Sequence, residues 1–309
     1  MIVINEEFNK IINKGTYIAL GSFDGIHLGH LTLIKKAVEL SRENNSYSMV
    51  YTFKNHPLSF INEKLVPSLL MDNKNKIEIL KSFNIDISCF INFNREFMNL
   101  SPRQFIEMLL KNYNMKGIII GFNYRFGHKN LGNVDLLKKF SEEYGFSLTV
   151  MDAFEYNGEV VSSTRIRESL SKGKIKEANY MLSRPYNLTG KVVKGRQLGR
   201  TIGFPTANIE IDPNYLIPKI GVYYTNVEFN GQIFKGITSV GHNPTVNGKK
   251  LTIETYILNF DKSIYDCELK VYFLDRIRDE IKFNSLESLK EQLNKDKNVA
   301  KERKIMINI

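Results

Sequence analysis

The stretch GSFDGIHLGH, residues 21–30, decides the fold of the N-terminal half of this chain. It directly follows the apolar run Tyr17-Ile18-Ala19-Leu20, which predicts a buried strand that Gly21 ends. Beyond it, apolar residues recur at helical spacing, at Leu33, Ile34, Ala37 and Leu40. The sequence therefore predicts a strand, a tight turn and a helix.

Two histidines stand where this helix is expected to begin. His27 and His30 are separated by Leu28 and Gly29. A helix N-terminus favours phosphate because it has unpaired N–H groups and a partial positive charge, and Gly29 has no side chain to hold an anion away. Imidazoles beside the phosphates can donate hydrogen bonds to the charge that develops on a leaving pyrophosphate. The turn therefore suits adenylyl transfer.

Strand and helix signals alternate as far as about residue 155. This alternation predicts a Rossmann-like α/β domain, in which helices cover both faces of a parallel sheet. Ligands of such sheets bind beyond the carboxyl ends of the strands, where the turn at 21–30 is expected to lie. The other apolar runs that predict strands are 47–53, 87–93, 117–122 and 147–154.

Two further segments follow predicted strands and are therefore expected at the same edge of the sheet. One is the glycine-rich loop GFNYRFGHKNLG, residues 121–132, in which Asn123 and Arg125 are candidate contacts to a nucleotide or phosphate. The other is TFKNHP, residues 52–57, which follows the predicted strand at 47–53.

A third segment, VSSTRIR, ends this half at residues 161–167. Arg165 and Arg167 add positive charge there, and a guanidinium can bind phosphate oxygens through two parallel hydrogen bonds. No GxxxxGK[ST] pattern occurs in the chain, so a P-loop is not expected. The residues expected to cap the following helix and to surround an anion with hydroxyls and N–H groups are Ser162, Ser163 and Thr164.

A different pattern begins near Arg184, where short alternating runs replace the long helices. Asn-Gly pairs at 230–231 and 247–248 are strong hairpin signals, and short strands at regular spacing predict a small antiparallel β-barrel. Only the end of the chain predicts a helix, which we expect Asn284 to cap. Its apolar face is Leu286, Leu289 and Leu293.

The segment GRQLGRTIGFPTAN, residues 195–208, carries the chemistry of the second half. Its glycines allow a loop that surrounds phosphates with backbone N–H groups, and Arg200 adds positive charge. The Thr206 hydroxyl and the Asn208 amide oxygen are hard ligands, suited to a Mg²⁺ ion that keeps most of its waters. The three glycines are Gly195, Gly199 and Gly203.

These motifs resemble those of bacterial bifunctional riboflavin kinase/FMN adenylyltransferases, also called FAD synthetases. HLGH resembles the HxGH signature of nucleotidyltransferases, GFNYRFG the family's GxDFRFG, and VSSTRIR its ISSTRIR. PTAN looks like the ATP and metal site of riboflavin kinases. The resemblance covers nearly the whole chain. It implies that the C-terminal half phosphorylates riboflavin to FMN with ATP, and that the N-terminal half adenylylates FMN to FAD with release of pyrophosphate.

The resemblance also implies roles for individual residues. Glu254, in IETYILNF, matches the glutamate that accepts the proton of the attacking riboflavin hydroxyl. The implied sets are, for catalysis, Glu254, His27, His30 and Arg165; for flavin, Phe53, His56 and Arg125; for magnesium, Thr206 and Asn208; and for ATP, Gly21, Phe23, Gly29, Asn123, Ser162, Ser163, Thr164, Arg167, Gly195, Arg200 and Gly203.

Two other interpretations stay open at this stage. One is a monofunctional nucleotidyltransferase whose second domain has lost kinase activity and only binds flavin. The other is a nucleic-acid-related protein, since class I aminoacyl-tRNA synthetases carry a related HIGH motif, although no KMSKS-like loop follows HLGH. The family pattern also weakens after Glu254: relatives tend to have LDFxGDLYG where residues 258–266 are LNFDKSIYD.

The bulk properties are those of an ordinary globular protein, with 42% hydrophobic and 25% charged residues. A chain of 309 residues favours two domains over one, expected at 1–184 and 185–309. The net charge of +10 is spread among acids, which disfavours a nucleic-acid partner. Two distant cysteines predict reduced thiols. With no secretory or membrane-spanning signal, we expect a cytoplasmic monomer or weak oligomer that binds neither nucleic acid nor membrane.

Overall fold

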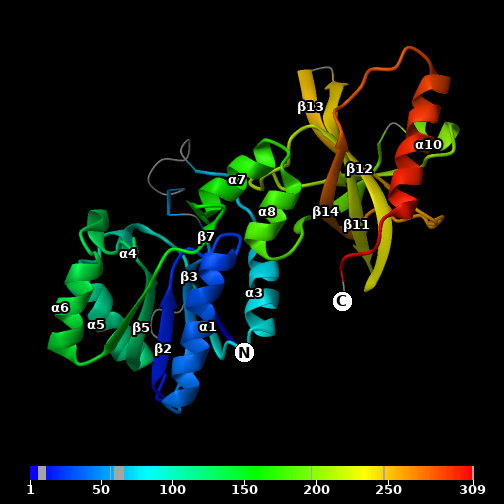
Figure 1. Ribbon diagram of the computed structural model, residues 1–309. Coiled ribbons are helices and arrows are strands. Elements are labelled where there is room, and N and C mark those ends of the chain that lie inside the picture. Colours follow the sequence, from blue (N-terminus) through cyan, green and yellow to red (C-terminus); the bar gives the residue numbers. More distant parts are fainter. Residues whose placement is uncertain (6–11, 56, 59–65, 196, 246–247, 308–309) are drawn as a thin grey trace. The chain divides into compact units, whose positions relative to one another are not determined.

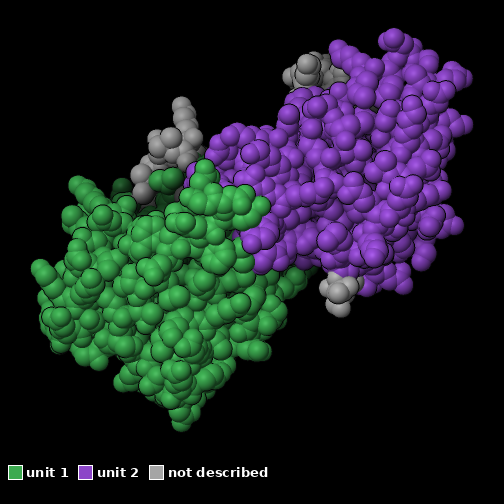
Figure 2. All heavy atoms as spheres, in the orientation of Figure 1, with its two compact units in different colours: residues 1–67, 72–162 green, residues 68–71, 163–309 purple. Residues whose placement is uncertain are grey.

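The structure is a computed structural model that describes residues 1–5, 12–55, 57–58, 66–195, 197–245 and 248–307 (Figure 1). The chain divides into two compact units, which Figure 2 distinguishes by colour. Unit 1 comprises residues 1–67 and 72–162, and unit 2 comprises residues 68–71 and 163–309.

Unit 1 is built around a six-stranded sheet in which neighbouring strands are parallel (Figure 1). The strand order is β1-β4-β3-β2-β5-β6, so that β2 lies between β3 and β5. The edge strand β1, which pairs with β4, was not predicted from the sequence. The strands are β1 (Ile2–Asn5), β2 (Thr16–Leu20), β3 (Tyr47–Phe53), β4 (Ile87–Ile91), β5 (Met115–Gly121) and β6 (Ser147–Met151).

Helices cover both faces of this sheet. Ile18 and Leu20 of β2 share one buried cluster with residues of α5 and α6. The apolar stripe of α1 stands outside that cluster and lies against β2, β3 and β5 from the other face. This arrangement confirms the predicted α/β fold class. A short hairpin, β7 (Glu155–Tyr156) and β8 (Glu159–Val160), follows β6. The helices of unit 1 include α1 (Leu28–Glu43), α3 (Asn73–Ser82), α4 (Arg95–Met98), α5 (Pro102–Tyr113), the 3₁₀ helix η2 (His128–Asn130) and α6 (Val134–Tyr144).

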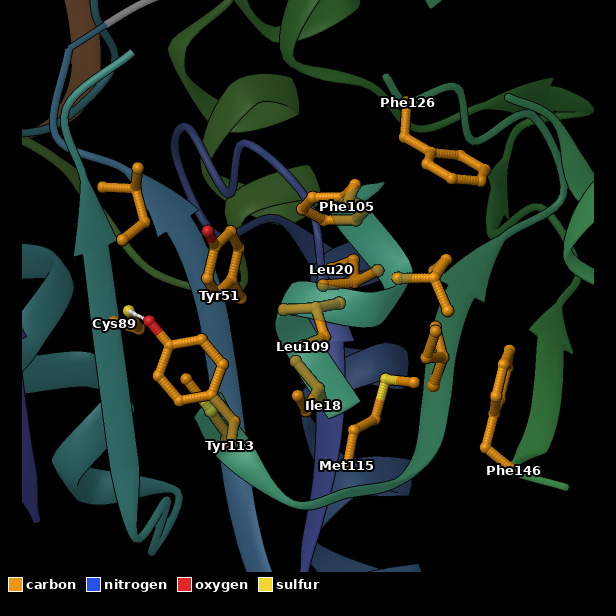
Figure 3. Packing of buried hydrophobic residues seen from close by; sticks show 14 of the residues in the cluster. Ile18, Leu20, Tyr51, Cys89, Phe105, Leu109, Tyr113, Met115, Phe126 and Phe146 are labelled. Atoms are coloured by element: carbon orange, nitrogen blue, oxygen red, sulfur yellow. Dashed lines mark hydrogen bonds between the residues drawn. The ribbon is translucent and has the colours of Figure 1, made fainter. Parts of the chain in front are cut away.

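Figure 3 shows the core on the α5 side of the sheet, where aromatic rings pack among aliphatic side chains. The Tyr113 hydroxyl lies 3.6 Å from the Cys89 sulfur. Burial raises the pKa of the Cys89 thiol to about 12, so this thiol stays protonated. Cys89 and Cys267 are both free cysteines, as the sequence predicted.

The strand order creates a switch point at the carboxyl ends of β2 and β5. These strands are neighbours, but the chain leaves β2 for α1 on one face and leaves β5 for α6 on the other. Ligands of doubly wound sheets bind where successive connections diverge in this way. The loops that diverge here contain residues 21–27 and 121–132, the two glycine-rich motifs of the N-terminal half.

Unit 2 is a closed six-stranded antiparallel barrel, which confirms the predicted architecture of the C-terminal half. Asn230 and Gly231 join β11 to β12 with φ of 49° and 73°, the left-handed conformation of a tight hairpin turn. The predicted turn at 247–248 lies partly outside the described residues. The strands are β9 (Tyr186–Val193), β10 (Thr206–Glu210), β11 (Gly221–Phe229), β12 (Gln232–Thr245), β13 (Gly248–Ile257) and β14 (Glu268–Arg278).

A terminal helix, α10 (Leu286–Glu302), completes the barrel unit. Its N-cap is Ser285 and not Asn284, because the extended backbone of Ser285 lets its hydroxyl accept from the Ser288 N–H in a capping box. The other helices of unit 2 include α7 (Ser163–Ser171), α8 (Ile175–Leu182) and the short α9 (Leu198–Thr201). None of the helices that the structure describes is long and apolar enough to span a membrane.

The helices α7 and α8 cluster with the barrel and not with the parallel sheet. The Asn179 amide of α8 donates to the Phe273 carbonyl of β14 at 2.8 Å and accepts from the Tyr186 N–H at 2.8 Å. The compact units therefore divide at residue 162, whereas the boundary after residue 184 stays a prediction.

Candidate active sites

The first candidate site is the turn between β2 and α1. His27 is the N-cap of α1, and its Nδ1 accepts a hydrogen bond from the His30 backbone N–H at 3.3 Å. Because Nδ1 is the acceptor, a neutral His27 ring carries its proton on Nε2. The two imidazole rings stack with their centroids 3.7 Å apart. Both histidines therefore lie together at the start of the helix.

The turn that precedes these histidines is buried and strained. Phe23 and Ile26 are inaccessible to solvent, yet their φ angles are 49° and 34°. Residues with a Cβ rarely adopt positive φ, and a β-branched residue does so least of all. Such backbone persists only where the surrounding structure holds it. The Phe23 ring lies 5.0 Å from the His30 ring, so this strained turn supports one of the histidines.

Two glycines allow these rings to pack. A Cβ at Gly29 would lie 3.2 Å from Cε1 of His27, and a Cβ at Gly21 would lie 3.1 Å from Cε2 of Phe23. Both distances are tighter than ordinary contacts between heavy atoms. Gly29 therefore admits the His27 ring over the first turn of α1, in addition to leaving the helix N–H groups open to an anion.

Other predicted residues of unit 1 follow the carboxyl ends of neighbouring strands. Phe53 is the last residue of β3, and its ring packs edge-on against Phe93, with centroids 5.5 Å apart. Asn123 and Arg125 are exposed in the loop that follows β5. His56 lies outside the described residues.

The hydroxyl-bearing residues of VSSTRIR lie at the start of α7. The helix begins at Ser163, so Ser163 and Thr164 belong to its first turn and do not precede it as predicted. Ser162 is the last residue of unit 1, whereas Ser163 is the first residue of this segment in unit 2.

The arginines of this segment have partners within unit 2. The Arg165 Nη2 lies 3.7 Å from Oε1 of Glu177 on α8. The Arg167 Nε donates to the Ser68 carbonyl at 2.8 Å. Both guanidinium groups are thereby oriented by other parts of the barrel unit.

The second candidate site lies on two neighbouring strands of the barrel. Asn208 of β10 lies opposite Glu254 of β13 in the antiparallel register. Thr206, two residues earlier on β10, points to the same face, and its hydroxyl donates to Oε2 of Glu254 at 3.3 Å. Three side chains from two distant parts of the sequence therefore form one oxygen-rich cluster.

The glycine-rich loop packs tightly on this cluster. A Cβ at Gly195 would overlap the side-chain amide of Asn208, and a Cβ at Gly199 would overlap the Phe204 carbonyl. Gly203 has open space around it but a φ of 82°, which glycine adopts without strain. The glycines therefore have distinct roles, because two allow close approach and the third allows a turn.

A cavity opens beside the cluster. Its lining includes Arg200 and Thr206 together with the loop at 260–265. The Gln197 amide donates to the Tyr265 hydroxyl at 3.3 Å, which connects the glycine-rich loop to this second loop. The loop in which the sequence departs from the family pattern therefore lines the cavity and places Lys262 there.

Two known protein families match the two halves of this chain. The FAD synthetase family model matches residues 9–165, and the riboflavin kinase family model matches residues 182–304. The bifunctional riboflavin kinase/FMN adenylyltransferase of Buchnera aphidicola is 36% identical over 297 residues, with 94% of this chain and 95% of the relative covered. That of Listeria monocytogenes is 38% identical over 289 residues, with 92% and 90% covered.

The chain belongs to the bifunctional riboflavin kinase/FMN adenylyltransferase family. A solved structure from Streptococcus pneumoniae, named a macrolide-efflux protein, shares the fold over the whole length. It has a TM-score of 0.89 and 31% sequence identity, and the match covers 98% of this chain and all of that chain.

One residue beside the site of this family's FAD synthetase half was not predicted from the sequence. Lys76 of α3 is buried, and its ammonium donates to the Ser22 carbonyl in the turn before His27. The signal in the sequence was weak: Lys76 precedes the buried Leu80 by four residues and therefore shares its helical face, but the polar residues directly before it favour an exposed position.

Proposed function

We propose that this chain is a bifunctional enzyme that makes FMN and FAD. Unit 2 phosphorylates riboflavin with ATP, and unit 1 transfers the adenylyl group of a second ATP to FMN. The observation that carries the proposal is the cluster of Thr206, Asn208 and Glu254, because it joins two motifs of the kinase half through the strand register of β10 and β13 and a hydrogen bond.

Glu254 is the proposed general base of the kinase step. Its carboxylate accepts the proton of the terminal ribityl hydroxyl while that oxygen attacks the γ-phosphorus of ATP. The new P–O bond forms as the bond to the bridging β–γ oxygen breaks, and ADP leaves. The hydrogen bond from Thr206 fixes the carboxylate on the face that Asn208 shares. Such positioning is a major source of catalysis in phosphoryl transfer.

Mg²⁺ is the proposed metal of the kinase site, and the residues present fit it. The Thr206 hydroxyl and the Asn208 amide oxygen are hard ligands beside a carboxylate. Because the protein supplies few ligands, waters and phosphate oxygens can occupy the remaining positions of the ion. When bound, the ion neutralises negative charge on the phosphates. Gly195 serves this group by leaving space for the Asn208 amide.

The cavity beside the cluster is the proposed nucleotide site of unit 2. Arg200 in its lining supplies positive charge for the phosphates, and backbone N–H groups of the loop around Gly199 and Gly203 can surround them. Lys262 adds a second positive charge where relatives tend to have glycine. We therefore propose that this chain binds the nucleotide with an additional basic contact.

The turn at the start of α1 is the proposed adenylyl-transfer site. A phosphate oxygen of FMN attacks the α-phosphorus of ATP, and the bond to the pyrophosphate oxygen breaks. The first N–H groups of α1 and the rings of His27 and His30 stabilise the charge that pyrophosphate acquires. Gly21, Phe23 and Gly29 shape the turn that receives the nucleotide.

The other residues that the sequence predicted for the N-terminal half are proposed contacts of the adenylyl-transfer site. Phe53 lies at the carboxyl edge of the sheet among other aromatic rings, which suits a flat flavin ring system. Arg125 and Asn123 suit phosphate and nucleotide from the neighbouring loop. Roles in adenylyl transfer remain predictions from the sequence for Ser162, Ser163, Thr164, Arg165, Arg167 and His56.

The test is to incubate the purified chain with riboflavin, ATP and Mg²⁺ and to separate the flavins by chromatography. We expect FMN to form first and FAD to follow. Chelation of divalent cations should stop both steps, and added Mg²⁺ should restore them. Unaltered riboflavin would contradict the proposal. Conversion of supplied FMN without any phosphorylation of riboflavin would instead support a monofunctional adenylyltransferase.

Gly195→Ala should impair the kinase step selectively. The added Cβ overlaps the Asn208 amide, so this ligand must move away from the cluster. A displacement of about 1 Å can cost about 10²-fold in rate, and we expect a loss of up to that size in riboflavin phosphorylation. Adenylylation of supplied FMN is the internal control and should be unchanged. Full kinase activity in the variant would argue against a role for the Asn208 amide.

A further inference from the structure

Lys76 is a buried cation that the proposed chemistry does not yet use. Only 5% of the residue is exposed, and its Nζ donates to the Ser22 carbonyl at 3.2 Å. The ammonium also lies 5.8 Å from the ring centroid of Phe90 on β4. Burial of a charged group costs free energy. A chain that places a lysine here therefore gives up stability at this position, which is typical of a functional residue.

The Ser22 carbonyl is held by two different elements. The Thr52 hydroxyl of β3 donates to it at 2.8 Å, and the Lys76 ammonium of α3 donates from a second direction. Ser22 directly precedes Phe23, the residue with positive φ whose ring packs against His30. A continuous series of contacts therefore runs from the lysine to the histidine.

We propose that Lys76, in its charged form, is a positioning residue for adenylyl transfer, an inference that rests on the proposed function of unit 1. It fixes the Ser22 carbonyl and thereby the strained turn that supports His30. Its charge also lies beside the backbone of this turn, the proposed site of the triphosphate. Lys76 itself touches no reacting atom.

The surroundings of Lys76 make its charge sensitive to pH. Burial lowers the pKa of its ammonium to about 8. The negative charge of Asp24, a buried residue of the turn between β2 and α1, opposes this effect. The ammonium therefore loses its proton as the pH rises through about 8. A bound polyphosphate favours the charged form and should raise the pKa of Lys76.

The decisive measurement is kcat/KM for ATP in the conversion of FMN to FAD, followed from pH 7 to 9.5. For the unmodified chain we expect a fall of about tenfold between pH 7 and 9, as a group with a pKa near 8 deprotonates. In kcat, which reports the complex with substrates, the fall should move to higher pH. Lys76→Met should be about tenfold less active at pH 7 and should converge with the unmodified chain at high pH.

Three variants separate charge from packing. Thr52→Val removes the other donor to Ser22, so any loss that it causes should be the same at every pH. Lys76→Arg keeps a charge at all of these pH values and should retain activity at pH 9. Lys81→Met changes an exposed lysine of the same helix and should leave the profile unchanged. Riboflavin phosphorylation by unit 2 should be unchanged in each variant, and thermal unfolding reports whether unit 1 is intact.

Thermal unfolding gives an independent readout. Because the pKa of Lys76 is lower in the folded chain than in the unfolded one, its charge opposes folding at neutral pH, and this cost disappears above the unfolded pKa. Lys76→Met should therefore unfold at a temperature no lower than the unmodified chain while it loses adenylyl transfer. A purely structural role would lower both together.

The outcomes distinguish this inference from the proposed function. If the unmodified chain makes no FAD from FMN, the function of unit 1 is wrong. If it makes FAD but the ratio of unmodified to Lys76→Met activity is constant with pH, the role of the Lys76 charge is wrong. If that variant fails to fold, the pH profiles of the unmodified chain still test the inference. The inference is wrong if the pH midpoint of the fall in kcat is the same as that of the fall in kcat/KM.

Discussion

Glu254→Gln should greatly slow riboflavin phosphorylation and leave FMN adenylylation intact. Glutamine preserves the shape of the side chain and an oxygen that can accept from the Thr206 hydroxyl, but it cannot take the proton of the attacking hydroxyl. A positioned base contributes about 10²–10⁴-fold, so the kinase kcat should fall by that factor. The rate of FMN formation from riboflavin, measured by flavin chromatography, tests this.

The matched control is Glu228→Gln, the same change on another strand of the barrel. The Glu228 carboxylate accepts from the Tyr272 hydroxyl and stands outside the cluster on β10 and β13. We expect this variant to phosphorylate riboflavin normally. If Glu254→Gln also keeps full kinase activity, another group must accept the proton, and the role assigned to Glu254 is wrong.

Local pattern was sufficient to predict most of the architecture. The apolar run before Gly21 and the helical spacing after His30 predicted β2 and α1, because both signals are confined to neighbouring residues. The Asn-Gly pair at 230–231 predicted the hairpin of β11 and β12 for the same reason. The edge strand β1 was missed, since a short run of four residues gains its stability from pairing with β4 and not from its own pattern.

Long-range pairing explains what the sequence could not predict in the barrel site. The motif that contains Thr206 and Asn208 predicted a metal site, but only the register of β10 against β13 places Glu254 opposite Asn208. Strand register depends on the whole barrel, and a shift by one residue would turn Glu254 to the other face. The resemblance to a known family supplied this residue in advance of any geometry.

Burial is equally hard to predict from one sequence. Lys76 stands among asparagines and lysines in NKNKIEILKS, which favours an exposed position. The fold nevertheless buries it, because α3 turns this face toward the turn after β2. The choice between Asn284 and Ser285 as helix cap also depended on backbone dihedral angles that adjacent polar residues do not reveal.

His30→Ala should stop the chain at FMN, with riboflavin phosphorylation unaffected. The imidazole of His30 stacks on His27 and contacts Phe23, so its loss removes a hydrogen-bond donor and one wall of the site. Removal of one donor to a developing negative charge typically costs about 10²–10³-fold in kcat, and we expect FAD formation from supplied FMN to fall by that much.

His27→Asn tests the neighbouring imidazole while it keeps the helix start. Asparagine is a good N-cap and can still accept from the His30 N–H, so α1 should remain stable. A loss of FAD formation in this variant would therefore be due to the missing ring and not to fraying of the helix. If both histidine variants accumulate FMN at the normal rate and still convert it to FAD, the charge on pyrophosphate is stabilised elsewhere and the assignment of this turn is wrong.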